Sequence, residues 1–163
     1  MDEIVRKLKL RLAADEDTDA LIHLINTAFR RVEAFFVGDR DRVDEETVRS
    51  YLRKGEFLMA FDGSHLAGCV YVEKRGERAY LGLLSVDPQR QKAGVGSMLM
   101  DGAEKHCAGA GCRAMDLQFV NVRRELPAFY HHRGYVETGT EPFPAEINTK
   151  SPCHFVRMSK ALG

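Results

Sequence analysis

The sequence has no excess of either charge and no long apolar run. Lysine and arginine together number 24, and so do aspartate and glutamate, in a chain of 163 residues. Proteins that bind nucleic acid without regard to its sequence carry a basic excess, because their affinity comes from neutralising phosphates. A membrane helix needs about 18 consecutive apolar residues, and no segment approaches that length. We therefore expect neither a nucleic acid nor a membrane as a partner.

Cysteine is scarce and irregularly spaced. The four residues, Cys69, Cys107, Cys112 and Cys153, form no C-x-x-C pair and do not match the spacing of zinc ligands. This pattern is typical of reduced, mostly buried thiols. In the first residues, MDEIVRKLKLRL, apolar side chains alternate with charged ones, and the segment does not resemble a signal peptide. The sequence thus predicts a cytoplasmic protein without a metal site.

The chain also lacks repeats and low-complexity tracts, which favours one domain over residues 1–163. Apolar periodicity and turn residues predict its elements. The predicted strands are Leu8–Leu12, Phe57–Phe61, Leu66–Glu73, Ala79–Val86, Ala114–Val120, Tyr135–Thr140 and His154–Ser159. The predicted helices are one capped by Asp15–Thr18 with an apolar face from Leu21 to Phe29, then Asp44–Lys54, a third from Val95 to near Gly109, and Arg124–Arg133. The order β-α-α-β-β-β-α-β-α-β-β indicates an α+β domain around a central mixed sheet.

The segment 80–97 consists of a predicted strand, a break at Asp87-Pro88, and a loop with two glycines that opens into a helix. The first N–H groups of a helix have no acceptor within it, and the helix dipole favours an anion such as a diphosphate there. Gly94 and Gly96 permit a bend and the close approach of a phosphate, although they also fit an ordinary strand-to-helix turn. The loop lacks the Gly-Lys-Ser/Thr of a nucleotide P-loop, and Leu99 stands where the dinucleotide fingerprint has its third glycine. Neither nucleotide motif therefore fits.

The spacing Gln91-x-x-Gly94-x-Gly96 resembles the coenzyme A loop of the GNAT (GCN5-related N-acetyltransferase) family. Further along, the segment 129–135, FYHHRGY, resembles that family's Phe-Tyr-x-x-x-Gly-Phe/Tyr motif. The order of predicted elements is similar over most of the chain. The resemblance implies a three-layer α/β/α fold with a mixed, mostly antiparallel sheet of about seven strands and about four helices. It also implies acetyl-CoA as a cosubstrate and no metal.

The resemblance assigns roles to particular residues. In the family, the strand before the loop pairs through its backbone with the pantetheine arm, and the N–H of Val86 would donate to the thioester oxygen. Tyr130 would lie near the coenzyme sulfur and protonate the leaving thiolate, unless it is only a half-buried tyrosine beside a helix stop. Asn121 would contact the coenzyme, or else serve as a turn or cap residue. The residues implied in coenzyme binding are Leu84, Ser85, Val86, Gln91, Lys92, Ala93, Gly94, Val95, Gly96, Ser97 and Asn121.

One position departs from the family. Many members carry a glutamate on the strand before the coenzyme loop, and this sequence has Tyr80 there. Candidates for a base elsewhere are Glu73, Asp116, Glu141 and His154, although each also fits a surface or structural position. An acceptor amine of low pKa could instead release its proton to water.

The predicted function is transfer of an acetyl group from acetyl-CoA to a primary amine of a small molecule or a peptide. Phe35 and Phe36 lie in a charged segment and either wall an acceptor pocket or attach the segment to the core. Tyr80 in place of a carboxylate leaves open a coenzyme-binding module without turnover. An interaction domain without coenzyme is a further alternative. The family often dimerises, so a homodimer is compatible with the sequence.

Overall fold

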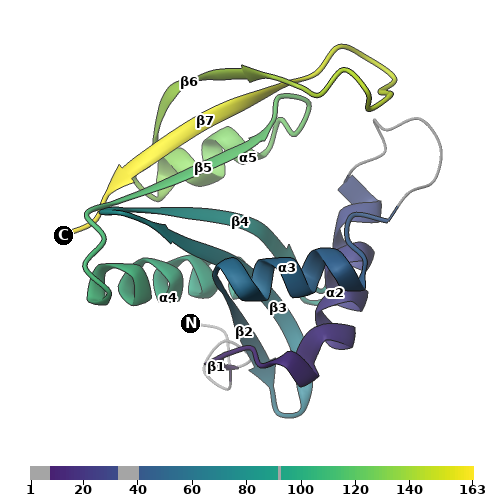
Figure 1. Cartoon of the computed structure of the whole chain (residues 1–163), viewed down its shortest axis with the longest axis vertical. Helices are drawn as coiled ribbons and strands as arrows, with labels where there is room; N and C mark the ends of the chain where they lie inside the picture. The colour runs from purple at the N-terminus through teal and green to yellow at the C-terminus, as the bar shows by residue number, and fades with distance from the viewer. Residues whose placement is uncertain (1–7, 33–40, 92) are drawn as a thin grey trace.

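The computed structural model describes residues 8–32, 41–91 and 93–163 and has a seven-stranded sheet with helices on both faces (Figure 1). In chain order the elements are β1 (Leu8–Leu12), the 3₁₀ turn η1 (Asp15–Asp17), α2 (Thr18–Val32), α3 (Glu45–Lys54), β2 (Glu56–Asp62), β3 (His65–Arg75), β4 (Arg78–Val86), the 3₁₀ turn η2 (Pro88–Arg90), α4 (Val95–Gly109), β5 (Ala114–Val120), α5 (Leu126–His132), β6 (Val136–Pro142) and β7 (His154–Ala161). This is the order that the sequence predicts. Lys92, Phe35 and Phe36 lie outside the described residues.

The strands lie in the order β1-β2-β3-β4-β5-β7-β6. All neighbouring pairs are antiparallel except β4 and β5, which are parallel. Hairpin connections join β2 to β3 and β3 to β4, whereas α4 forms the crossover from β4 to β5. The sheet is therefore mixed and mostly antiparallel, as predicted.

Each face of the sheet has its own apolar cluster. On one face, Leu99 and Met100 of α4 are fully buried against β2 to β5, and α5 belongs to the same cluster. On the other face, Leu21 and Ile25 of α2 and Val48 of α3 are fully buried. Because helices pack on both faces, the fold has three layers, and Figure 1 shows α2 and α3 in front of the sheet.

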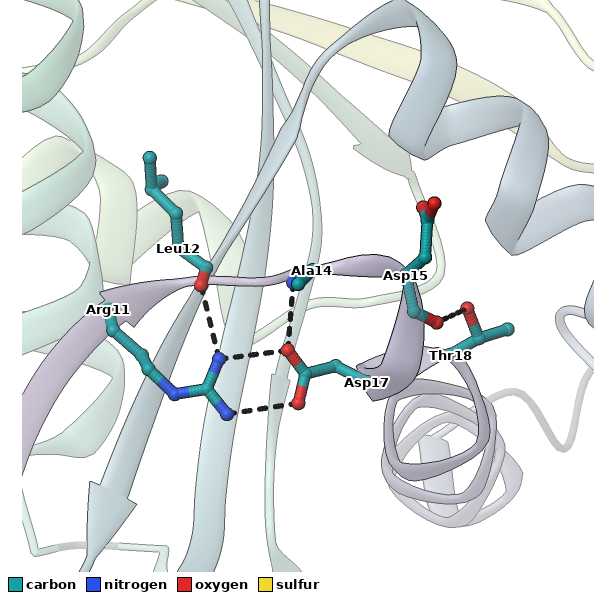
Figure 2. A network of polar contacts seen from close by, with 6 residues as sticks. All are labelled: Arg11, Leu12, Ala14, Asp15, Asp17 and Thr18. Atoms are coloured by element: carbon teal, nitrogen blue, oxygen red, sulfur yellow. Dashed lines mark hydrogen bonds and ion pairs between the residues drawn. The ribbon is translucent and has the colours of Figure 1, made fainter.

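A polar network fixes the entry to α2 (Figure 2). The two guanidinium nitrogens of Arg11 donate to the carboxylate of Asp17 at 2.8 and 2.9 Å, and the N–H of Ala14 donates to the same carboxylate at 2.8 Å. The hydroxyl of Thr18 donates to the Asp15 carbonyl at 2.7 Å. The acidic residues therefore form a 3₁₀ turn before the helix, and the pKa of Asp17 is lowered mainly by Arg11.

The last helix is shorter than the predicted range. It begins at Leu126, because Pro127 lacks an N–H and fits only in the first turn, and it ends at His132. Among the described residues, no helix is long and apolar enough to cross a membrane.

Asp116 joins three strands at the end of the sheet where β4 and β5 pair. Its carboxylate accepts two hydrogen bonds from Arg78 of β4, at 2.6 and 2.7 Å, and one from Ser159 of β7 at 2.5 Å. These bonds, led by those from Arg78, lower the pKa of Asp116. The carboxylate thus connects β4, β5 and β7, and its role in this protein is structural.

Replacing Asp116 by Asn is expected to destabilise the protein at neutral pH and much less in acid. Since folding lowers the pKa of Asp116, its contribution is complete above its ordinary value of 3.8 and is lost as the pH falls below that value. Urea unfolding of both proteins at neutral pH and at about pH 3 measures this difference. A stability difference that is the same at both pH values would show that the charge of Asp116 plays no part.

Candidate active site

The strands β4 and β5 pair over only three residues. Arg78, Ala79 and Tyr80 face residues 114–116, after which no further pairing between the two strands is found in the described chain. Figure 1 shows the two strands diverging from this point toward their carboxyl ends. Backbone N–H and C=O groups of β4 that point toward β5 are therefore open to a ligand.

A bulge in β4 accompanies this divergence. Gly82 pairs with Tyr71 and Ser85 pairs with Cys69, so two residues of β4 lie opposite one residue of β3. One of the two, Leu83, has a φ of 52°, which is uncommon for a residue other than glycine. A bulge bends its strand and changes the direction of its side chains, and such backbone strain is frequent at functional sites. The backbone conformation of β4 therefore contributes to the divergence of β4 from β5.

The start of α4 provides open N–H groups beside this gap. Gly94 occupies the N-cap with a φ of 81°, a conformation that favours glycine, and the N–H groups of residues 95–97 have no acceptor within the helix. A Cβ on Gly96 would lie 3.8 Å from Phe129 and from Val86, which is ordinary contact. Packing within the protein therefore does not require glycine at position 96, and the close approach of a ligand would.

A cavity of about 740 Å³ connects this helix start with the other face of the sheet. One end is lined by Gln91 and residues 94–97 and, from α5 and the segment before it, by Arg123, Glu125, Leu126, Phe129 and Tyr130. The middle is lined by Leu81, Gly82, Leu83, Leu84 and Val86 of β4 and by residues 117–120 of β5. The far end is lined by Ala28, Phe29, Arg42, Tyr51, Tyr71 and Tyr80. The cavity thus passes between the two diverging strands.

Tyr130 lies on the wall of the cavity within an aromatic cluster. Its ring is 5.7 Å from that of Phe119, 5.2 Å from that of Phe129 and 5.8 Å from that of Tyr135. Only 6% of the residue is exposed, and burial raises the pKa of its hydroxyl to about 12. The ring is therefore fixed, and the hydroxyl keeps its proton at neutral pH.

The sequence model of the Acetyltransferase (GNAT) family matches residues 18–135, which is most of the chain. The chain belongs to the GNAT acetyltransferase family. The enzymes of this family are acyltransferases that use acetyl-CoA. No match is found among curated proteins.

Solved structures of N-acetyltransferases share the GNAT fold of this chain. Ard1 from Thermoplasma volcanium matches with a TM-score of 0.80 at 18% identity, over 96% of this chain and 99% of that one. The ribosomal-protein-S18-alanine N-acetyltransferase from Escherichia coli has a TM-score of 0.77 at 16% identity, over 96% and 94%. The structure of yncA from Salmonella typhimurium, a candidate acetyltransferase, contains its cofactor acetyl-CoA and gives a TM-score of 0.75 at 17% identity, over 96% and 95%. At these identities the likeness establishes the fold.

Several residues that the sequence assigns to the coenzyme line the cavity of this GNAT domain, and others do not. Those on its wall are Leu84, Val86, Gln91, Gly94, Val95, Gly96, Ser97 and Tyr130. The side chain of Ser85 is instead buried and donates to the Leu83 carbonyl at 2.9 Å, and Ala93 is buried in the core cluster beneath α4. The Asn121 side-chain oxygen accepts from the His154 N–H at 2.8 Å, which joins the end of β5 to β7. Any contact of Ser85 or Ala93 with coenzyme would therefore involve the backbone.

The four acid or histidine residues considered as bases lie off the cavity wall. Glu73 accepts from Tyr71 and Arg75, at 2.7 and 2.5 Å, and Asp116 is held by Arg78 and Ser159. Glu141 pairs with Arg157 at 3.1 Å, and His154 bonds to Asn121 through its backbone.

In residues 8–32, 41–91 and 93–163, no group of three His, Cys, Asp or Glu side chains is placed to hold a metal.

Tyr80, in contrast, does line the cavity of the GNAT domain. A Cβ on Gly82 would lie 3.0 Å from its ring, so the ring covers the glycine on the same face of β4. The guanidinium of Arg75, which belongs to β3, lies 4.4 Å from the centre of the Tyr80 ring. Burial raises the pKa of Tyr80, so its hydroxyl is a hydrogen-bonding group and a poor base at neutral pH.

Sequence patterns did not indicate Arg42, Tyr51 or Tyr71 as site residues. Tyr51 and Tyr71 pack edge to face with ring centres 4.6 Å apart, although they come from α3 and β3. Alternation along β3 predicts which face Tyr71 occupies, but only the packing of α3 on the sheet brings Tyr51 beside it.

Proposed function

We propose that this GNAT protein transfers the acetyl group of acetyl-CoA to a primary amine of a small molecule or a peptide. The observation that carries the proposal is the cavity that joins the open N–H groups of residues 95–97 to the far end of the site. A diphosphate suits those N–H groups, and an extended pantetheine arm suits the open edge of β4 near Leu84 and Val86. The thioester would then lie between the two strands, beside Tyr130.

The chain offers groups for the donor half of the reaction. The amine nitrogen attacks the thioester carbonyl carbon, the C–S bond breaks, and the thiolate takes up a proton. An N–H of β4, such as that of Val86, would donate to the carbonyl oxygen as negative charge develops on it. Tyr130 would donate its proton to the thiolate. Since burial raises the pKa of Tyr130 to about 12, its hydroxyl carries the proton before the reaction begins.

The proton of the amine has a different destination. Glu125 is the only acidic residue on the cavity wall among those that the structure describes, and it pairs with Arg123 at 2.6 Å. We therefore assign the removal of this proton to water. The rate at neutral pH would then depend on the fraction of the amine that is already neutral.

The test is to mix the purified protein with acetyl-CoA and a panel of primary amines, and to measure free thiol and acetylated amine. Acetyl-CoA is expected to raise the Tm by binding the folded state, and thiol should appear only with an amine present. Stabilisation without turnover would favour the second candidate, a coenzyme-binding module without catalysis. The observation that favours this candidate is Tyr80 in place of a glutamate. No stabilisation at all would favour an interaction domain.

A cytoplasmic location and a homodimer remain predictions from the sequence.

A further inference from the structure

The far end of the cavity has a composition suited to a particular class of acceptor. Phe29 of α2, Tyr51 of α3 and Tyr80 of β4 line it with aromatic rings. Arg42, from the segment that precedes α3, lies on the same wall, with its guanidinium carbon 5.4 Å from the ring centre of Phe29. Aromatic and cationic groups therefore meet at this end.

A buried amide holds the backbone next to Arg42. The side chain of Asn26 in α2 donates to the Val43 carbonyl and accepts from the Val43 N–H, both at 2.9 Å. Asn26 is 6% exposed and Val43 is 3% exposed. Because both backbone groups of Val43 are bound, the preceding residue is fixed over α2. The preceding carboxylate, that of Asp41, forms an ion pair with Arg30.

The elements at the far end contribute one charged residue to the part of the cavity wall that the structure describes. The charged residues on the described cavity wall are Arg42, Arg90, Arg123 and Glu125. Arg123 pairs with Glu125, and Arg90 lies 3.5 Å from Asp62 and from Asp87. Arg90 ends η2, and Arg123 and Glu125 precede α5, whereas Arg42 precedes α3. Arg42 is therefore the charged residue of the described wall that lies at the far end.

The nearby aromatic faces are occupied by guanidinium groups. Arg42 lies over Phe29, and Arg75 lies over Tyr80 while its charge is paired with Glu73 at 2.5 Å. Burial raises the pKa of Tyr80, and the positive charge of Arg42 acts against this rise. A second ammonium group would be repelled here, whereas a carboxylate would be attracted.

We propose that the acceptor is an amine that also carries a carboxylate, and that Arg42 binds this carboxylate at the far end of the cavity. The proposal rests on the proposed acetyl transfer. Arginine has five N–H donors and binds a carboxylate through two parallel hydrogen bonds, so it can do so while keeping other contacts. The acceptor would be an amino acid or a similar anionic amine, and polyamines would be poor substrates.

The test compares amino acids with their amides and with diamines, using acetyl-CoA and thiol release. We expect kcat/KM for the best amino acid to exceed that for its amide about tenfold or more, mainly through KM, because a charged hydrogen bond is lost in the amide. Arg42→Gln should raise KM for the amino acid by a similar factor and leave KM for the amide unchanged. Arg42→Lys should retain part of the preference. Arg49→Gln, which removes an exposed arginine of α3 that pairs with Glu45 and lies off the cavity wall, should change neither value.

Two results would overturn the proposal. One is a wild-type enzyme that acetylates amides or diamines as efficiently as amino acids, which would leave acetyl transfer itself intact. The other is an Arg42→Gln variant that still binds acetyl-CoA, as judged by its Tm shift, and keeps the full preference for a carboxylate. If acetyl-CoA binds and no amine of any class is acetylated, the proposed function fails, and this inference fails with it.

Discussion

Replacing Tyr130 by Phe is expected to lower kcat about 100-fold, as the loss of a general acid commonly does. The KM for acetyl-CoA and the Tm should change little, because the ring remains among Phe119, Phe129 and Tyr135 and only the hydroxyl is lost. Steady-state kinetics with a saturating amine measures the effect. An unchanged kcat would remove Tyr130 from the chemical step.

Tyr135 offers a matched control for this variant. Its ring lies 5.8 Å from that of Tyr130, but its hydroxyl donates to Glu104 at 3.0 Å and it is not on the cavity wall. Tyr135→Phe should therefore lower the Tm slightly through the lost hydrogen bond and leave kcat unchanged. Equal losses of kcat in both variants would point to a general disturbance of the aromatic cluster.

Replacing Gly96 by Ala is expected to raise the KM for acetyl-CoA at least tenfold without lowering the Tm. The added methyl group finds only ordinary contacts within the protein, at 3.8 Å, so folding tolerates it. It would nevertheless occupy the space through which a phosphate reaches the N–H groups of α4. One weakened hydrogen bond to a charged group costs about 1.5–3 kcal/mol, which corresponds to roughly 10- to 100-fold in affinity.

Gly109→Ala is the control at the opposite end of the same helix. Nothing lies within 4 Å of a Cβ placed there, and the position is distant from the cavity wall. Its KM should equal that of the wild type. If Gly96→Ala binds acetyl-CoA as tightly as Gly109→Ala does, the diphosphate does not lie at the start of α4.

The sequence predicted the fold well because its elements are locally encoded. Alternating leucines mark β1, the Asp44 side chain caps α3 by accepting from the Thr47 N–H at 2.8 Å, and Gly94 permits the left-handed turn before α4. Each of these signals acts over a few residues. The order of elements was therefore accessible without tertiary information.

The geometry of the site depends on contacts between distant residues, which local patterns do not contain. Asp116 was a plausible base until its bonds to Arg78, 38 residues away, placed it in the sheet framework. Arg42 reaches the cavity because its neighbour Val43 is bound by Asn26, which lies 17 residues earlier in the chain. The burial of Tyr130 among rings from β5 and from the segment after α5, which raises the pKa of its hydroxyl to about 12, is likewise a property of tertiary packing.

A crystal structure of the protein with acetyl-CoA would show directly how the cavity holds the coenzyme. We expect the diphosphate at the N–H groups of residues 95–97, the pantetheine arm along β4 between Leu84 and Val86, and the sulfur in contact with the hydroxyl of Tyr130. The thioester carbonyl should face the end of the cavity that holds Tyr80 and Arg42. A coenzyme bound elsewhere, or with its sulfur directed away from Tyr130, would contradict the proposed site of acetyl transfer.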